Sequence, residues 1–238
     1  MDDPNRDSPV VITTAMVLAA GEGQRMRPLT LTTPKPLLSA GGKTLIEWQL
    51  EKLKVAGITR VVVNVSYLGK QIMDYLGNGR RFDLELCFSP EPEPLETGGA
   101  LHRALDQLGK EPFLLVNGDV WTDFPLQSLV HRQPDGGHLL MIANPPHHPQ
   151  GDFCLQGEQL NPRSSGVGEP RTFSGISVIN PLGFARYPQR RERFPLKEVF
   201  DWWMQRGELT GESYDGSWMD IGTPERLEDL RDRLGPGG

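Results

Sequence analysis

Two patterns of apolar and polar positions alternate along the first half of the chain. Short apolar runs, typical of strands buried on both faces, are separated by segments in which apolar residues recur at helical spacing. The apolar runs predict strands at residues 15–19, 60–65, 84–88 and 113–116. The helical spacing predicts helices at residues 44–56, 68–76 and 97–108. This alternation predicts an α/β fold with a mostly parallel sheet and helices on both of its faces.

The alternation weakens after residue 123, where strands dominate. The pattern predicts strands at residues 138–143, 152–155, 175–179 and 213–220, and helices at residues 196–206 and 224–234. Residues 156–170 are polar and contain glycine and proline, which predicts a loop. We expect one domain at residues 15–234, whose halves, 15–123 and 124–234, share one sheet. A flexible extension, 1–14, and a short tail, 235–238, are expected to flank it.

Composition narrows the class of protein. Charged residues make up 24% and hydrophobic residues 37% of the chain, as in ordinary globular domains. The net charge of −6 argues against a nucleic-acid partner, and no apolar run is long enough to span a membrane. Cys87 and Cys154 lie far apart in apolar stretches, which predicts buried free thiols in a reducing, cytoplasmic setting. A monomer is the default expectation.

The first apolar run is followed by a loop suited to bind phosphate groups. Gly21 and Gly23 allow backbone N–H groups to approach an anion closely, because no Cβ intervenes. Arg25, Arg27 and Lys35 follow and add positive charge. A glycine turn combined with arginine and lysine in this way is suited to a polyphosphate, although Arg27 could equally be a surface charge.

Two other phosphate-binding motifs do not match. The G-x-G-x-x-G dinucleotide fingerprint would need a third glycine where Met26 stands, and Pro28 follows at once. The P-loop motif G-x-x-x-x-G-K-[ST] could end at Gly42, Lys43 and Thr44, but its first glycine would fall on Leu37. We therefore interpret the glycine pair at 41–42 as a turn before a helix.

The segment LAAGEGQRMRP, together with TPKPL, resembles the signature of nucleotidyltransferases that make nucleoside-diphosphate sugars. The similarity extends from about residue 15 to about residue 234. It implies a Rossmann-like domain with a small sugar-binding lobe. It also implies that a loop including Ala19, Ala20, Gly21 and Gly23 binds a nucleoside triphosphate.

Two aspartates follow predicted strands. Asp119 ends the segment VNGD, and Asp220 lies in WMDIGT. Taken alone, Asp119 could equally be a turn or helix-capping residue. The resemblance implies that both aspartates hold Mg²⁺ on the phosphate groups, in keeping with the preference of this ion for hard oxygen ligands.

The resemblance also implies a reaction. An oxygen of a sugar 1-phosphate attacks the α-phosphorus of the nucleoside triphosphate, and pyrophosphate leaves. Such chemistry requires positioning and charge neutralisation more than covalent catalysis. Arg25 is expected to neutralise the leaving pyrophosphate, and Lys35 to bridge the α-phosphate and the incoming phosphate. Lys197 resembles a family lysine that reaches the acceptor phosphate, with a solvent-facing helix lysine as the alternative.

The nucleotide base is expected to bind near the segment SPEPEPLETGGA. Glu91, Glu96, Thr97 and Gly98 of this segment, together with Asn117, are the candidate nucleotide-binding residues. An ionised carboxylate accepts hydrogen bonds, which favours uracil with its N3–H over cytosine without excluding thymine or guanine. The equally open alternative is that Glu91 or Glu93 is a solvated charge in a proline-rich loop.

The segment NPPHHPQGDF resembles uridylyltransferases that act on N-acetylmuramic acid 1-phosphate in cell-wall recycling. By this resemblance, Asn144 and Asp152 contact sugar hydroxyls, and Gly175 allows close approach of the sugar. The E-K-P motif of many family members, with its sugar contacts, is missing before residue 175. Paired histidines in this loop could bind a metal, but neighbouring loop histidines usually face apart.

The expected function is transfer of UMP from UTP to a sugar 1-phosphate, first of all N-acetylmuramic acid 1-phosphate. Glucose 1-phosphate, mannose 1-phosphate and phosphocholine remain alternative acceptors, and a non-catalytic nucleotide sensor is a further alternative. The lactyl carboxylate of N-acetylmuramic acid would need hydrogen-bond donors. His148, Arg171 and backbone amides near Gly175 are the candidates.

Overall fold

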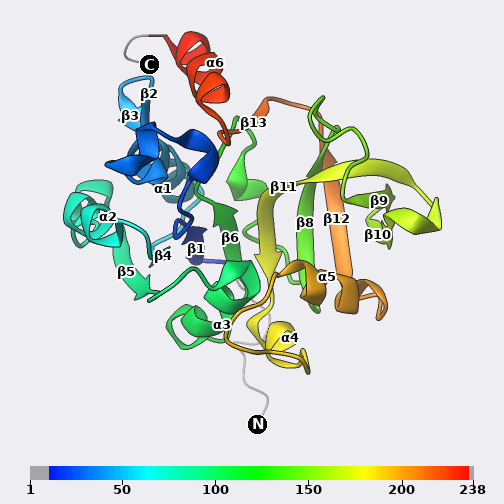
Figure 1. The fold of residues 1–238 in the computed structure, drawn as a ribbon. Helices are drawn as coiled ribbons and strands as arrows, with labels where there is room; N and C mark the ends of the chain where they lie inside the picture. The colour runs from blue at the N-terminus through cyan, green and yellow to red at the C-terminus, as the bar shows by residue number, and fades with distance from the viewer. Residues whose placement is uncertain (1–10, 236–238) are drawn as a thin grey trace.

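The apolar runs of both halves of the chain come together in one sheet, seen in the computed structural model, which describes residues 11–235 (Figure 1). Within these residues the sheet has nine strands. In spatial order they are β5 (Glu85–Pro90), β4 (Arg60–Val65), β1 (Thr14–Leu18), β6 (Phe113–Asn117), β11 (Glu169–Ile179), β8 (Gly137–Ile142), β12 (Leu209–Tyr214), β10 (Gln159–Pro162) and β9 (Phe153–Gln156). The second half therefore continues the sheet of the first half.

Strand direction differs between the two halves. β5, β4, β1 and β6 run parallel, as the βα alternation predicts. β11 is antiparallel to both β6 and β8, β8 and β12 are parallel, and β10 and β9 are antiparallel neighbours at the edge. The parallel half places the ends of β1, β4 and β6 at one edge of the sheet, where ligands of such sheets bind.

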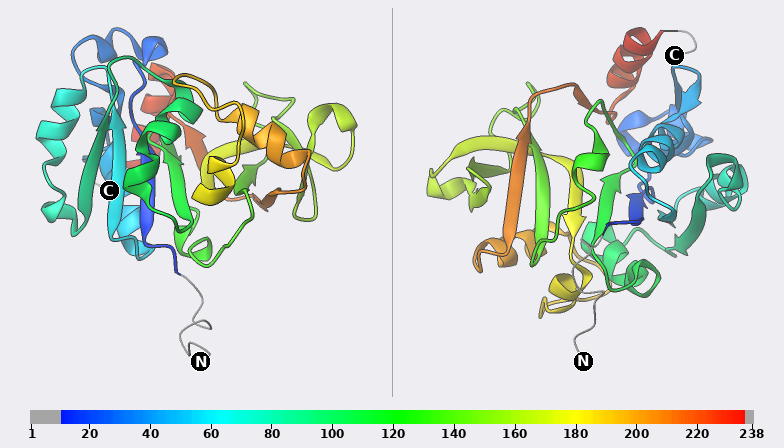
Figure 2. Two further views of the ribbon diagram at one scale, coloured as in Figure 1. Left: turned by 90° about the horizontal axis from the view of Figure 1, so that it is seen from below. Right: turned by 180° about the vertical axis from the view of Figure 1, so that it is seen from behind.

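Helices cover both faces of the sheet. They are α1 (Leu45–Val55), α2 (Gly69–Leu76), α3 (Glu96–Leu108), α4 (Pro181–Ala185), α5 (Lys197–Met204) and α6 (Pro224–Leu234). Apolar side chains of α1 and α2 pack on one face, and those of α3, α4 and α5 on the other. Figures 1 and 2 show the green α3, yellow α4 and orange α5 on the same side. α6 packs separately, around Ile221, Leu227 and Leu230.

β1 shows why its sequence forms a central strand. Ala15 and Val17 are fully buried in the core under α1 and α2, whereas Met16 is fully buried in the core under α3 and α5. Alternate residues of a strand face opposite sides, so a strand covered by helices on both faces must be apolar throughout. The helix after it begins with a capping box, in which Thr44 and Glu47 bond to each other's backbone N–H groups.

The second half departs from the predicted elements in two places. The predicted loop at 156–170 contains β10 and the start of β11. The predicted strand at 213–220 is two strands, because the chain turns at Asp215 and Gly216 between β12 and β13 (Trp218–Asp220). β13 leaves the large sheet and pairs with β7 (Val120–Thr122). A short hairpin of β2 (Ser39–Ala40) and β3 (Lys43–Thr44) accounts for the glycine pair at 41–42.

Residues 11–14 of the predicted extension 1–14 belong to the folded domain, since β1 begins at Thr14. Residues 1–10 and the end of the predicted tail, 236–238, lie outside the described residues. Ile12, however, is buried in the core, and its N–H bonds to Val130 O. Both cysteines are free thiols; Cys154 is buried as predicted, but Cys87 is only partly buried. Within residues 11–235, no helix combines the length and the apolar character that a membrane crossing requires.

Candidate active site

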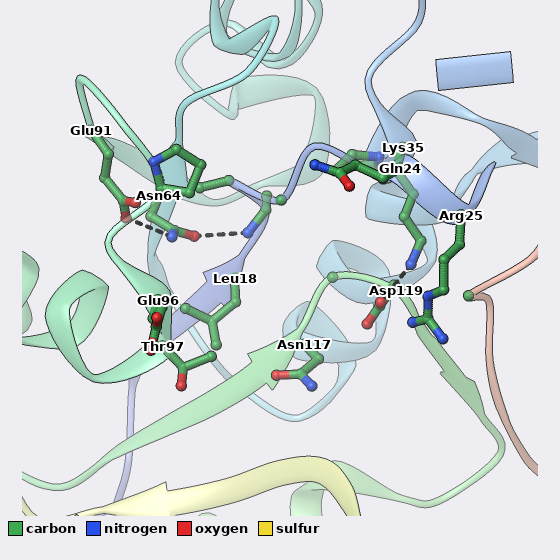
Figure 3. Close-up of a pocket in the computed structure, with 18 residues that line it drawn as sticks. Leu18, Gln24, Arg25, Lys35, Asn64, Glu91, Glu96, Thr97, Asn117 and Asp119 are labelled. Atoms are coloured by element: carbon green, nitrogen blue, oxygen red, sulfur yellow. Dashed lines mark hydrogen bonds and ion pairs between the residues drawn. The ribbon is translucent and has the colours of Figure 1, made fainter. Parts of the chain in front are cut away.

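A cavity of about 500 Å³ lies at the carboxyl ends of β1, β4 and β6. Its walls come from loops that follow these strands, from the beginning of α3 and from the segment after β13. The lining residues are Leu18, Ala19, Ala20, Gly21, Gly23, Gln24, Arg25, Lys35, Pro36, Asn64, Glu91, Pro94, Glu96, Thr97, Asn117, Gly118, Asp119 and Gly222. Figure 3 shows Arg25, Lys35 and Asp119 on one side of this cavity and Asn64 with Glu91 on the other.

The glycine loop, which contains Gly21 and Gly23, lines part of the cavity. A Cβ placed on Gly21 would meet no atom within 4 Å, so this position faces open space. Gly23 has a φ of 63° and lies directly before a short 3-10 helix, Gln24–Met26. A Cβ there would lie 2.9 Å from Thr30 Cγ2, so both conformation and space require glycine. The loop therefore leaves its backbone open to a ligand at Gly21, while Gly23 holds its turn.

Lys35 and Asp119 form an ion pair on one side of the cavity. Lys35 Nζ lies 2.5 Å from Asp119 Oδ2. The lysine side chain is only 12% exposed, whereas that of the aspartate is 36% exposed. Gly118 donates its N–H to Leu18 O, which holds the Asp119 turn against the end of β1. The two predicted residues thus meet although they are far apart in the sequence.

The pairing of β13 with β7 brings Asp220 close to Asp119. Asp220 pairs with Val120, and the N–H of Ile221 donates to the carbonyl of Asp119 at 2.7 Å. The Asp220 carboxylate contacts Arg226 and lies 3.1 Å from His147 Nε2. Asp220 therefore stands at the rim beside Asp119, and Gly222 of the same segment lines the cavity.

This pair of carboxylates fits one type of metal site. Within residues 11–235, no group of three or more His, Cys, Asp or Glu side chains is arranged to hold a metal ion. Mg²⁺ commonly takes one or two carboxylates and completes its shell with phosphate oxygens and water. Asp119 and Asp220 provide hard oxygens in that number, and in this structure their carboxylates contact Lys35 and Arg226.

The two arginines of the loop differ in their surroundings. Arg25 lines the cavity, and a Cβ on Gly222 would lie 3.1 Å from its Nη2 and 3.0 Å from Asp220 Oδ2. Glycine at 222 thus lets Arg25 approach the Asp220 segment. Arg27 is not among the residues that line the cavity; its side chain is about half exposed and pairs at 3.7 Å with Glu22. It is the surface charge that the sequence left as an alternative.

A buried polar chain holds the loop after β1, and its central residue was not predicted from the sequence. Asn64 Oδ1 accepts from the Ala19 N–H at 2.7 Å, and Asn64 Nδ2 donates to Glu91 Oε1 at 2.7 Å. Glu91 Oε2 accepts from the Leu95 N–H at 3.0 Å. Glu91 is only 5% exposed, so it is not a solvated loop charge. The asparagine within RVVVNV was the available signal, since a buried polar group requires partners.

The beginning of α3 is joined to the second half of the chain by residues 193–197, which we call the strap. Thr97 Oγ1 accepts from the Leu196 N–H at 2.9 Å. The N–H groups of Gly98 and Gly99 both donate to Phe194 O, at 2.9 and 3.1 Å. A Cβ on Gly98 would lie 2.6 Å from the Phe194 ring. Gly98 is therefore buried against the strap and does not line the cavity, contrary to its expected place at the base.

Glu96 and Thr97, two of the candidate nucleotide-binding residues, line the cavity. Glu96 has a φ of 61°, an uncommon conformation for a residue with a side chain. Its carboxylate pairs with Arg193 of the strap at 3.3 Å.

A smaller chamber of about 230 Å³ adjoins the cavity and shares Leu18, Thr97 and Asn117 with it. The other lining residues are Leu115, Asp152, Phe153, Phe173, Pro195, Leu196, Lys197 and Phe200. We call it the acceptor chamber. The structure thus brings Asp152 and Lys197 together with Asn117. Lys197 also pairs with Asp201 at 2.7 Å, and its side chain is largely exposed although it borders the chamber.

Two residues expected at the sugar have other surroundings. Asn144 donates to the carbonyls of Pro149 and Pro170 and accepts from Thr172, so it braces its own loop and lines no described cavity. Gly175 has a φ of 84°, and a Cβ there would lie 2.7 Å from Asn117 Nδ2. Gly175 therefore makes room for the Asn117 side chain and does not itself face the chamber. A sequence pattern can indicate that such a residue is important, but it does not distinguish a residue that supports a loop from one that contacts a ligand.

The paired histidines face apart, as expected. His147 lies by Asp220, whereas His148 Nε2 lies 3.2 Å from Asp152 Oδ1. Asp152 Oδ2 also accepts from the Phe173 N–H at 2.8 Å, which fixes this carboxylate against β11.

Shifted pKa values occur at three ionisable groups outside the cavity lining, namely Lys52, Asp123 and Tyr214. Burial lowers the pKa of Lys52 to about 8, and the Asp123 charge opposes this shift. A hydrogen bond from Tyr214 lowers the pKa of Asp123. Burial, followed by the hydrogen bond to Asp123, raises the pKa of Tyr214 to about 12.

Solved structures share this architecture. A Bacillus anthracis protein assigned as a glucose-1-phosphate thymidylyltransferase, solved with sucrose, has a TM-score of 0.81 at 21% identity, covering 93% of this chain and 94% of its own. HddC from Yersinia pseudotuberculosis, solved with GMP-PN, has a TM-score of 0.76 at 21% identity, covering 94% of this chain and 100% of its own. These similarities show that the fold is shared.

Sequence comparisons show the family. N-acetylmuramate alpha-1-phosphate uridylyltransferase of Neisseria meningitidis serogroup B is 42% identical over 224 residues, covering 91% of this chain and 96% of that protein. Mannose-1-phosphate guanylyltransferase catalytic subunit beta of Drosophila melanogaster is 34% identical over 223 residues, covering 90% of this chain and 60% of that protein. The family profile described as nucleotidyl transferase matches residues 14–154. The chain therefore belongs to the nucleotidyl transferase family, as one of its sugar-1-phosphate nucleotidyltransferases.

Proposed function

We propose that this protein transfers UMP from UTP to N-acetylmuramic acid 1-phosphate, giving UDP-N-acetylmuramic acid and pyrophosphate in peptidoglycan recycling. The observation that carries the proposal is the pair of joined cavities, in which Asn117 and Thr97 line both the nucleotide side and the acceptor side. Support for the particular substrates comes from the Neisseria relative, which this chain matches over nearly its whole length.

The glycine loop would bind the triphosphate through backbone N–H groups around Gly21, where no side chain blocks approach. Lys35 stands between this loop and Asp119, which suits it to approach the α-phosphate and the incoming phosphate together. Arg25 lies by Gly222, where it can neutralise pyrophosphate. A magnesium ion held by Asp119 and Asp220 would supply further charge neutralisation when bound.

The base would lie between the loop after β1 and the beginning of α3. Glu91 is engaged with Asn64 and with the Leu95 N–H, so its role is to hold the walls in place. Glu96 and Thr97 are then the side chains that face the base. The Thr97 hydroxyl oxygen accepts from the Leu196 N–H, which ties this side of the base site to the strap.

On the acceptor side, Lys197 would bind the sugar phosphate, and Asp152 would accept hydrogen bonds from sugar hydroxyls. The aromatic rings of Phe153, Phe173 and Phe200 give this chamber an apolar wall suited to the faces of a sugar ring.

The test is a turnover matrix of UTP, dTTP, GTP and CTP against the 1-phosphates of N-acetylmuramic acid, N-acetylglucosamine, glucose and mannose. We expect the highest kcat/KM for UTP with N-acetylmuramic acid 1-phosphate. Equal or higher efficiency with glucose 1-phosphate, or GTP with mannose 1-phosphate as the best pair, would overturn the proposed substrates and leave the general class of reaction.

A further inference from the structure

A second chamber, of about 420 Å³, opens beside the acceptor chamber and shares Asp152, Phe153 and Lys197 with it. We call it the side chamber. Its remaining walls come from the loop before β9, from the end of β10 and the short helix after it, and from α5. They are formed by His148, Gly151, Pro162, Arg163, Ser164 and Asp201. The two chambers are therefore immediate neighbours, and Asp152, Phe153 and Lys197 border both of them.

The charges in the side chamber are paired with one exception. Lys197 Nζ lies 2.8 and 2.7 Å from the two oxygens of Asp201. Asp152 accepts from Phe173 and lies beside His148. Arg163, by contrast, donates at 2.8 Å to the neutral side chain of Gln150. In the described part of the chain, Arg163 forms no ion pair with a carboxylate.

The other groups that were expected to bind the lactyl carboxylate already have partners within the protein. Arg171 is nearly buried and pairs with Glu169 at 3.0 Å and Asp215 at 2.7 Å. The amide region at Gly175 packs against the Asn117 side chain. His148 does line the side chamber, but its Nε2 faces Asp152. Of these groups, none offers an uncompensated positive charge comparable to that of Arg163.

We infer that the side chamber holds a carboxylate-bearing substituent of the acceptor sugar, with Arg163 as its counterion. This inference rests on the proposed function and extends it to the group that distinguishes N-acetylmuramic acid from N-acetylglucosamine, an ether-linked lactic acid. A guanidinium offers forked donors that match the two oxygens of a carboxylate. Gln150 holds the arginine without neutralising it, so the charge remains available to the substrate.

The consequence is a selectivity that depends on one side chain. N-acetylglucosamine 1-phosphate presents the same ring, acetamido group and phosphate but leaves the side chamber without an anion. Loss of the Arg163 charge should therefore weaken only the sugar that carries the lactyl group. For one charge-assisted hydrogen-bonded pair at a solvent-exposed arginine, a loss of about tenfold is expected.

The experiment compares wild type, Arg163→Gln and Arg163→Lys, with Arg80→Gln as a matched control at an exposed arginine outside every cavity described above. Calorimetric binding of the two N-acetyl sugar 1-phosphates is measured, together with kcat/KM for each with UTP. We expect Arg163→Gln to lose about tenfold in affinity for N-acetylmuramic acid 1-phosphate and to keep its affinity for N-acetylglucosamine 1-phosphate. Arg163→Lys should fall between, and Arg80→Gln should match wild type.

The binding ratio of the two sugars decides the inference independently of turnover. A ratio that Arg163→Gln leaves unchanged, or a wild-type ratio near one, overturns the assignment of the side chamber. Failure of the proposed function would appear differently, as a preference of the wild type for another nucleotide or another sugar in the turnover matrix. A changed binding ratio in Arg163→Gln would support the side chamber even then.

Discussion

The backbone N–H of Leu196 donates a 2.9 Å hydrogen bond to Thr97 Oγ1, where the 500 Å³ cavity adjoins the acceptor chamber. Thr97 lines both spaces, and Leu196 is followed directly by Lys197. Phe194 reinforces the same connection, because its carbonyl accepts from two N–H groups of α3. The lysine proposed to bind the acceptor is therefore positioned by the helix that also lines the proposed base site.

This connection predicts a split effect for Thr97→Val, which removes the hydroxyl but keeps the shape. The Leu196 N–H would lose its partner in a part-buried place, at a cost of about 1–3 kcal/mol. We expect the KM for the acceptor to rise about fivefold or more, with a smaller change in the KM for UTP. Thr97→Ser keeps the acceptor oxygen and should stay near wild type. An effect on UTP alone in steady-state kinetics would contradict this role.

The paired placement of Asp119 and Asp220 predicts the effect of removing either charge. Asp119→Asn and Asp220→Asn should each lower kcat by roughly a hundredfold or more, because one charged group of the proposed phosphate and metal site is lost. Both positions are at the rim and partly exposed, so the melting temperature should shift little. Activity is measured across a Mg²⁺ titration, with circular dichroism as the folding control. Near-normal turnover at ordinary Mg²⁺ would remove that residue from the proposed metal site.

Arg25 and Arg27 provide a matched pair for the leaving group. Arg25 faces the cavity, whereas Arg27 pairs with Glu22 at the surface. Arg25→Ala should lower kcat by about a hundredfold and change the acceptor KM little, since a contact with departing pyrophosphate strengthens in the transition state. Arg27→Ala should leave both constants within about twofold. A rise in acceptor KM as the main effect of Arg25→Ala would place this residue at the sugar.

The strands and helices of the parallel half could be predicted from the sequence, because each segment with one apolar periodicity there corresponds to one strand or helix. The sequence also placed Gly21 and Asp119 at one edge, since carboxyl ends of parallel strands meet there. It could not show that the chain turns at Gly216 and leaves the large sheet, because apolar residues continue on both sides of the turn. That turn is what returns Asp220 to Asp119.

At the site, the sequence could mark positions but not the direction of their side chains. Asn144 and Gly175 lie in segments similar to those of the family, yet one braces a loop and the other accommodates Asn117. Asn64 was missed for the opposite reason. Its only signal was a polar residue inside an apolar strand, and its two partners, Ala19 and Glu91, come from distant loops.

Lys52 of α1 donates from its Nζ to Thr122 O of β7. Burial lowers the pKa of this lysine from 10.5 to about 8. The folded protein therefore releases this proton at a lower pH than the unfolded chain. Between about pH 8 and pH 10.5 the unfolded chain holds more protons, so the free energy of unfolding should rise with pH through this window. Below that window the buried charge is a destabilising term.

We expect the free energy of unfolding of Lys52→Met to lack this rise, which should amount to roughly 1–2 kcal/mol after allowance for solvent screening. The measurement is urea unfolding at several pH values from 7 to about 10.5, taken as the difference between wild type and variant so that other titrating groups cancel. Lys52→Arg is the control, because arginine keeps its charge over the whole range and should also lack the rise. Parallel pH profiles for wild type and Lys52→Met would show that Lys52 titrates alike in the folded and unfolded protein.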